Sequence, residues 1–339
     1  MQVQPLLHLF TPNTLRAFAV LACAYASFAL ADDSLLPEIV PDIAVETADV
    51  THEYVSEEFV NFVTHVDHFF GGERDFQESN QSVLQFDVSE LILQGGTRQG
   101  QFNGRTKISL PSTEKRLHLL VEADPEKNAS STDAVNKPKT VDQINAPQNV
   151  GVAARFEKAE ESAWHYSSDI GIRTPLPLQP FARARVSYSL PIETSRIKLT
   201  QSAYVFSISG AGESTQLDLE NQLNADAMFR ATSTATWGDI AQNFDLTQSF
   251  SVYHTLDTKR ATLYQASVIG SSHPKQVSDY VFSAAYRQQL NRRWLYFEIN
   301  PQIHFPKSAG YNFTPMLLLR LEVLFDSVKE PSHSPADSQ

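Results

Sequence analysis

The sequence predicts an all-β protein, a transmembrane antiparallel up-and-down β-barrel of about 14 strands (12 or 16 as alternatives) preceded by a short amphipathic helix. Three observations predict this fold class. Apolar and polar residues alternate with a period of two from about residue 82 to Phe325, as in strands with one apolar face. Most alternating segments have ~9–13 residues, which fits the ~9–11 of a tilted membrane strand better than the ~5–6 of strands in globular proteins. The connections alternate between short polar turns and longer segments that contain glycine or proline.

The composition alone would indicate a soluble acidic protein. The 339 residues carry a formal net charge of -12, and no apolar run reaches the ~20 residues of a membrane-spanning helix. The acidic charge argues against a nucleic-acid partner, which would require a basic face. The mean hydropathy is -0.27, but the apolar and polar faces of a barrel strand cancel in such an average.

Residues 1–31 have the layout of a signal peptide. Arg16 is the only charged residue before Asp32, and an apolar run follows it as far as the small residues at 29–31. This predicts cleavage after Ala31, because the run of about fifteen residues is too short to span a bilayer. A lipoprotein signal ending at Cys23 is an alternative, but the run continues beyond that residue. The mature chain would then have no cysteine, and so no disulfide or thiolate site.

Residues 32–81 are predicted to form a periplasmic linker and an amphipathic helix at about 53–70. The helix is indicated by apolar residues at spacings of three and four, which are Val55, Phe59, Phe62, Val63, Val66, Phe69 and Phe70. The stripe must be covered, so the helix could plug the barrel, pack on its periplasmic rim or bind a partner protein. Its histidines, His52, His65 and His68, are interpreted as solvated, and no metal site is predicted.

The barrel is predicted over residues 82–325, followed by a polar tail at 326–339. In the last strand Leu317, Leu319, Leu321, Val323 and Phe325 form one face, and Arg320 and Glu322 lie on the other. The apolar face of the clearer segments holds no acidic or basic residue, and an Arg or Lys there would cost ~2–4 kcal/mol at mid-membrane. A few glutamines interrupt this face, notably Gln201 and Gln248. The segments 83–93 and 260–270 are ambiguous. The remaining strands are expected near 101–110, 115–122, 148–157, 163–173, 180–190, 196–208, 214–223, 226–237, 244–255, 278–290, 294–305 and 314–325.

The polar face is predicted to line the lumen, with charges of both signs. The candidates are Arg105, Lys107, Arg116, His118, Glu122, Arg155, Glu157, Asp169, Arg173, Arg183, Arg185, Lys198, Asp218, Glu220, Arg230, Asp245, Arg287, Glu298, Arg320 and Glu322. These charges could set the preference of a water-filled channel. They could equally pair with one another and fill a lumen that has little open space.

Several segments resemble a family of functionally uncharacterised proteobacterial outer-membrane β-barrel proteins. They include SSDIGIRTPLPLQPFARARVSYSLP, FRATSTATW, AYRQQLNRRWLYFEINPQIHFP and TPMLLLRLEVLF. The resemblance runs from the helix to Phe325 and implies the outer membrane of a Gram-negative bacterium, but no catalytic or ligand residues. The stretch LLLRLEVLF also resembles the C-terminal signal read by the barrel-assembly machinery, although that signal usually ends the chain.

The leading hypothesis for function is a passive pore for small solutes or ions. The alternative is a closed barrel with an ion-paired lumen that serves as a structural or protein-interaction platform. The third is an outer-membrane hydrolase, suggested only by His165 and Ser167 on one strand face. We therefore predict no enzyme, no catalytic residues and no cofactor. The expected partners are outer-membrane lipid, the barrel-assembly machinery and a periplasmic protein bound through the helix.

Overall fold

The computed structural model describes residues 59–71, 76, 82–110, 116–129, 149–157, 163–174 and 176–326. The predicted signal peptide, the linker, Val55 and the C-terminal tail lie outside the described residues. The described chain contains fourteen strands, whose bounds are β1 Val83–Ile92, β2 Arg98–Ser109, β3 Leu117–Ala123, β4 Val150–Glu157, β5 Trp164–Arg173, β6 Gln179–Ile192, β7 Ser195–Phe206, β8 Gly210–Asn224, β9 Ala227–Gly238, β10 Asn243–Asp257, β11 Arg260–Ser272, β12 Lys275–Gln289, β13 Leu295–His304 and β14 Thr314–Asp326. Two short helices, α4 (Pro125–Ala129) and the 3-10 helix η3 (Lys307–Ala309), lie in connections, and a further helix covers 59–69.

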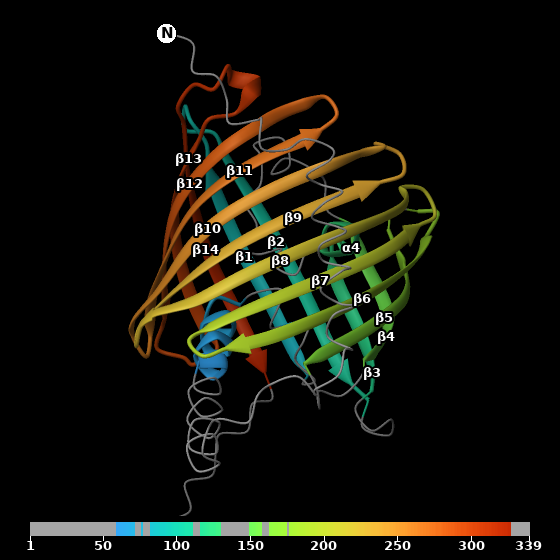
Figure 1. Cartoon of the computed structure of the whole chain (residues 1–339), viewed down its shortest axis with the longest axis horizontal. Helices are drawn as coiled ribbons and strands as arrows, with labels where there is room; N and C mark the ends of the chain where they lie inside the picture. The colour runs from blue at the N-terminus through green and yellow to red at the C-terminus, as the bar shows by residue number, and fades with distance from the viewer. Residues whose placement is uncertain are drawn as a thin grey trace, which may run out of the picture. The chain divides into compact units, whose positions relative to one another are not determined.

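The strands close into a single antiparallel barrel (Figure 1). Each strand pairs with its neighbours in the chain, and β1 closes the sheet by pairing with both β2 and β14. Closure leaves no strand edge with unpaired backbone groups, which is the condition for a sheet to cross a bilayer. The predicted fold class, an up-and-down barrel of about 14 strands, is confirmed.

The two faces of the barrel wall differ in chemistry along every strand. Large apolar side chains point outward and are exposed, for example Val88 (58%), Phe102 (60%) and Ile170 (75%). The alternate residues point inward, and most are polar and buried. In β6, for example, Arg183, Arg185 and Ser187 alternate with outward residues that are more exposed. A continuous apolar exterior is the surface that a barrel presents to lipid.

Charged residues on the outward face depart from this pattern, and one ion pair is an example. Glu90 of β1 and Arg98 of β2 lie 3.4 Å apart on the outer side, and both side chains are exposed. They flank the 93–97 connection, so they sit at one rim of the barrel rather than at mid-height. This pair is one reason why the period of the 83–93 segment is ambiguous in the sequence.

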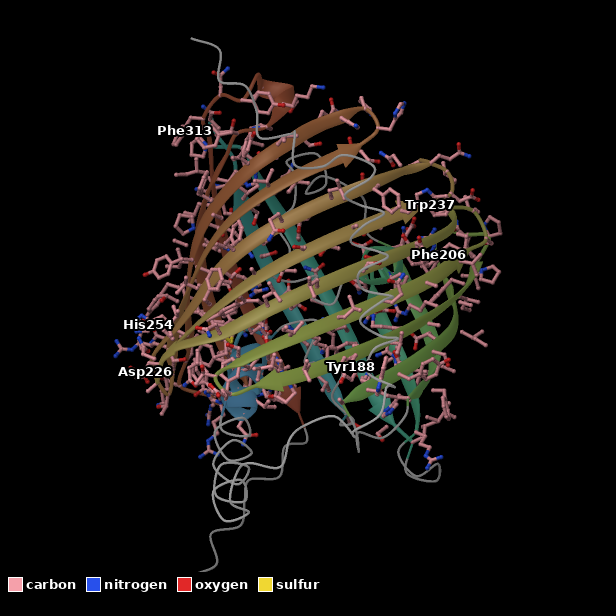
Figure 2. The ribbon with its side chains drawn as sticks, in the orientation of Figure 1. Tyr188, Phe206, Asp226, Trp237, His254 and Phe313 are labelled. Atoms are coloured by element: carbon pink, nitrogen blue, oxygen red, sulfur yellow. The ribbon has the colours of Figure 1, made fainter. Side chains whose placement is uncertain are left out.

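The connections define two ends of the barrel, here called the turn end and the loop end. The turn-end connections are 110–116, 158–163, 193–194, 225–226, 258–259 and 290–294, and the loop-end connections are 93–97, 124–149, 174–178, 207–209, 239–242, 273–274 and 305–313. Figure 2 shows Asp226 and His254 toward one rim, and Phe206, Trp237 and Phe313 toward the other.

The loop-end connections are longer only in part. The two longest connections, 124–149 and 305–313, lie there, but the 273–274 connection between β11 and β12 has two residues. The glycine and proline that suggested loops stand inside or between extended strands: Gly210 begins β8, and Pro274 lies in the two-residue turn. Strands therefore continue through segments whose turn-forming residues indicated a loop.

Across the described ranges of the chain, no helix combines the length and the apolar character that a membrane-spanning helix requires.

Candidate functional site: the barrel lumen

The lumen is the place where the predicted charged residues meet. The alternation within each strand directs these residues inward, and nearly all of them are buried. The buried ones are Lys107, His118, Glu122, Arg155, Glu157, Asp169, Arg173, Arg183, Arg185, Lys198, Asp218, Glu220, Arg230, Arg287, Glu298, Arg320 and Glu322. Arg105 also points inward and is half-buried, whereas Asp245 is exposed near the loop end. Arg116 is different: it precedes β3 at the turn end and is exposed, so it does not line the wall.

One ion-pair cluster is centred on Asp169 of β5. Its carboxylate accepts hydrogen bonds from Arg155 on β4, at 2.7 and 2.9 Å, and from Arg183 on β6. Arg183 also donates to Glu122 of β3, at 2.5 Å. The strand register produces this arrangement, because Asp169 stands directly between Arg155 and Arg183 on adjacent strands. Each charge gains the partner that a buried ion requires.

A second group surrounds Glu157 of β4. Its carboxylate lies 2.7 Å from the Lys107 ammonium, 2.8 Å from Nε2 of His165 and 3.4 Å from Nε2 of His118. Lys107, His118 and Glu157 are fully buried. No hydrogen bond joins His165 to Ser167 among the residues described, so the pair has no nucleophile–base contact of the kind a hydrolase requires.

A third group joins the last strands of the barrel. Arg287 of β12 donates to Glu322 of β14 at 2.7 and 3.2 Å and to Glu298 of β13 at 3.5 Å. Arg320 of β14 donates to Glu298 and lies 3.8 Å from Glu322. Glu298 and Arg320 face each other across the β13–β14 register. Two acidic and two basic groups therefore neutralise one another on this part of the wall.

The helix at 59–69 occupies the lumen at the turn end, where Figure 1 shows it in blue. Its stripe residues Phe59, Val63, Val66, Phe69 and Phe70 are buried, and Phe62 packs against them. The wall contributes the other half of this cluster with inward apolar residues, among them Val83, Met228, Tyr253, Ala261, Leu263, Ala285, Tyr296 and Leu324. The rings of Phe69 and Tyr296 are 5.6 Å apart, and those of Phe70 and Tyr253 are 5.4 Å apart, both edge to face. The helix therefore plugs the lumen at the turn end.

A buried ion pair also joins this plug to the wall. Oδ1 of Asp67 lies 2.6 Å from Nη2 of Arg230 on β9, and both side chains are buried. Arg230 donates in addition to Glu220 of β8 at 2.8 Å, and Glu220 accepts from Arg196 of β7 at 2.6 Å. Asp67 therefore connects the helix to a charge network that spans β7, β8 and β9.

The end of the plug is held through its backbone. Gly71 has a φ of +61°, a left-handed conformation that favours glycine, and its carbonyl accepts a hydrogen bond from Arg105 at 2.9 Å. A Cβ on Gly71 would lie 2.6 Å from Oε1 of Glu322, so a side chain would collide with the wall. Glycine is required here both by the turn and by the close approach.

The short helix α4, at the start of the 124–149 connection, also lies in the lumen. The backbone carbonyls of Pro125 and Asn128 in α4 accept hydrogen bonds from Arg183 at 3.2 Å and from Arg185 at 2.8 Å. Glu126 pairs with Arg173. These contacts place α4 against β5–β7, so this side of the lumen is filled by protein.

Sequence reasoning did not find every residue of the site. The sequence shows no sign of the helix α4, because its five residues are too few to show a helical period. Asp67 was not among the predicted lumen charges, although a signal existed: it stands four residues after Val63 and three before Phe70, on the buried face of the helix. Asp279 and His304, a buried pair 2.9 Å apart on β12 and β13, were also missed.

Fold and site together define a class: a closed barrel with an apolar exterior, an ion-paired lumen and a helical plug at one end. Neither the models of protein families nor the curated proteins give a match to this sequence. Solved structures with a similar architecture include the outer-membrane channel DcaP of Acinetobacter baumannii, with 8% identity, coverage of 72% of this chain and 96% of that chain, and a TM-score of 0.44. A loop-deletion mutant of OmpT, an outer-membrane protein of Vibrio cholerae, has 8% identity, 72% and 98% coverage, and a TM-score of 0.45. The fold assignment rests on the strand pairing of the chain itself.

Proposed function

We propose that the protein is an integral outer-membrane β-barrel that forms a passive pore for small solutes, closed at its turn end by the helix at 59–69. The observation that carries this proposal is the way the helix closes one end of the lumen: most of the inward wall is polar, and the helix packs its apolar residues against inward apolar residues at the turn end. A barrel of about eight strands is filled by its own side chains, whereas fourteen strands enclose more space. The helix and α4 occupy part of that space.

The outer-membrane location is supported by the exterior and by the direction of the chain. The outward face is mostly apolar, as lipid requires, and its polar residues on β7–β10 hydrogen-bond in pairs, Thr215 to Gln201 and Ser233 to Gln248. β1 begins and β14 ends at the turn end, and in outer-membrane barrels the short turns face the periplasm. The helix would then close the periplasmic mouth of a pore in a Gram-negative outer membrane. The final strand, β14, is the segment that the assembly machinery would read.

The plug is the element most able to move, because it contributes no strand to the sheet. Its described contacts with the wall are apolar packing, the Asp67–Arg230 ion pair and the Gly71 carbonyl. Moving it leaves every ladder hydrogen bond of the barrel intact. The pore can therefore open without unfolding the barrel.

The test is single-channel recording of purified full-length protein in planar bilayers. Phe70→Ala removes a ring that is 1% exposed and lies 5.4 Å from Tyr253, a truncation that costs about 3–5 kcal/mol in a packed core. We expect rare openings for the wild type and frequent or sustained conductance for Phe70→Ala.

Thr64→Ala is the matched control on the same helix. Thr64 is exposed, and its hydroxyl bonds only to the carbonyl of Val60 one turn earlier. This variant should conduct like the wild type. Conductance that stays at background for both wild type and Phe70→Ala, with the barrel folded, would contradict the pore.

The second candidate is a closed barrel that serves as a structural or interaction platform. It is favoured by the ion pairing of the lumen, since the clusters around Asp169 and Glu322 join inward charges of opposite sign across strands. On this hypothesis the helix would present its outer side, which includes Asn61, Thr64 and His65, to a periplasmic protein. The silent outcome of the recordings would select this alternative.

A further inference from the structure

The inner wall is chemically divided around its circumference. On β9, β10 and β11 the inward positions between Arg230 at the turn end and Asp245 at the loop end carry no charged residue. Most of those at mid-height are small hydroxyl residues or an amide, here called the hydroxyl stripe: Thr232, Thr234, Thr247, Ser249, Ser251, Gln265 and Ser267. The exception is Ile269 of β11, a buried apolar residue that stands beside Thr247. The stripe is a neutral, hydrogen-bonding surface that runs along the axis of the barrel.

The register aligns the stripe into rows across neighbouring strands. Thr232, Ser249 and Ser267 stand side by side, and the Ser267 hydroxyl donates to the Ser249 hydroxyl at 3.0 Å. In the next row Gln265 donates to the Ser251 hydroxyl at 3.1 Å. Thr232, Thr247 and Gln265 are half-buried rather than buried, so part of the stripe reaches accessible space.

Elsewhere on the wall the charges are already engaged. Asp169 binds two arginines, Glu157 lies against a lysine and two histidines, and Glu322 binds Arg287. Because their donors and acceptors serve one another, these groups offer little net charge to a passing ion.

The stripe and α4 occupy different parts of the wall. α4 fills the lumen against β5–β7, while the stripe covers β9–β11 with side chains that have few atoms beyond Cβ. Hydroxyl and amide groups both donate and accept hydrogen bonds. They can therefore replace the water molecules that solvate the hydroxyl groups of a polyol. A bare ion loses hydration in the same passage without gaining a counter-charge.

We infer that the hydroxyl stripe selects small neutral polyhydroxylated solutes, of the size and chemistry of a monosaccharide or sugar alcohol, over ions of equal size. This inference rests on the proposed pore function and names its solute class. The stripe provides a track of weak hydrogen bonds along which such a solute exchanges partners, which is what passage without trapping requires.

Swelling of proteoliposomes tests the selection with three open-chain polyols built on a six-carbon chain: neutral sorbitol, anionic gluconate and cationic N-methylglucamine. Full-length wild type and Phe70→Ala are reconstituted, and a heat-dependent gel shift verifies the folded barrel in each. We expect sorbitol to enter about tenfold faster than either ion, which corresponds to about 1.4 kcal/mol in the barrier. Equal rates, or faster entry of an ion, would overturn the inference while leaving the pore in place. No entry of any solute through either protein would overturn the pore and the inference together.

Thr247→Lys places a charge within the stripe, and Thr258→Lys places the same charge on the exposed turn between β10 and β11. Thr247→Lys should raise gluconate entry relative to sorbitol by about tenfold, because the new ammonium supplies the missing counter-charge. Thr258→Lys should keep the wild-type ratio. The same ratio in both variants would show that the stripe does not line the path.

Discussion

Asp169 illustrates how single residues hold the lumen together. It is 2% exposed and accepts from Arg155 and Arg183, each of which comes from an adjacent strand. A carboxylate so placed neutralises two guanidinium groups that have been removed from water. The free energy of the cluster therefore depends on every member being present.

We expect Asp169→Asn to lower the free energy of unfolding by about 3–5 kcal/mol, because it removes the carboxylate that two buried arginines share. Urea unfolding in detergent micelles, followed by tryptophan fluorescence, measures the change. Asp257→Asn is the control, since its partner Arg260 is exposed and water solvates both groups. Equal effects of the two substitutions would mean that the Asp169 cluster is solvated as well.

Among the elements, β14 shows the alternation at its centre. Leu319 and Leu321 point outward, whereas Arg320 and Glu322 are buried in the lumen. The period of two in the sequence and the geometry of a strand leave no other arrangement once one face is apolar. The register of this strand was readable from its residues alone.

Leu319→Lys should reduce assembly, because a lysine facing lipid near mid-height costs about 2–4 kcal/mol. Arg320→Lys retains a cation beside Glu298 and should assemble like the wild type. The fraction of chain that shows heat-dependent mobility in outer-membrane extracts measures assembly. Similar yields for both variants would contradict the inward and outward assignment of β14.

The plug and β11 show where the period of a single strand fails to predict which of its faces points inward. The 260–270 segment is ambiguous in the sequence because Ala261 and Leu263 point inward yet are apolar. They contact the plug, so the inner face of β11 has the chemistry of a core at the turn end. A periodicity argument assumes one polar face, and it fails where another element covers that face.

The whole molecule combines a mostly apolar exterior with charged side chains that face the lumen. Such a particle requires an amphipathic environment, because its outward side chains have no other cover.

Chain without residues 1–31 should therefore fold only in detergent or lipid. Gel filtration after refolding, with and without micelles, is the measurement. A chain that remains monomeric in plain buffer would show that the exterior does not face a membrane.

The sequence by itself determined the barrel, its strands and the facing of most lumen residues, because a period of two is a local property that a single strand imposes. It also determined the apolar stripe of the helix, because a period of 3.6 is equally local. Only the tertiary structure decided which charges meet, that α4 fills one side of the lumen and that the helix plugs the turn end. Asp67 and Arg230 are 163 residues apart in the chain, and no local pattern specifies a contact between them. Barrel closure brings them together, and the burial of both charges then makes the pairing necessary.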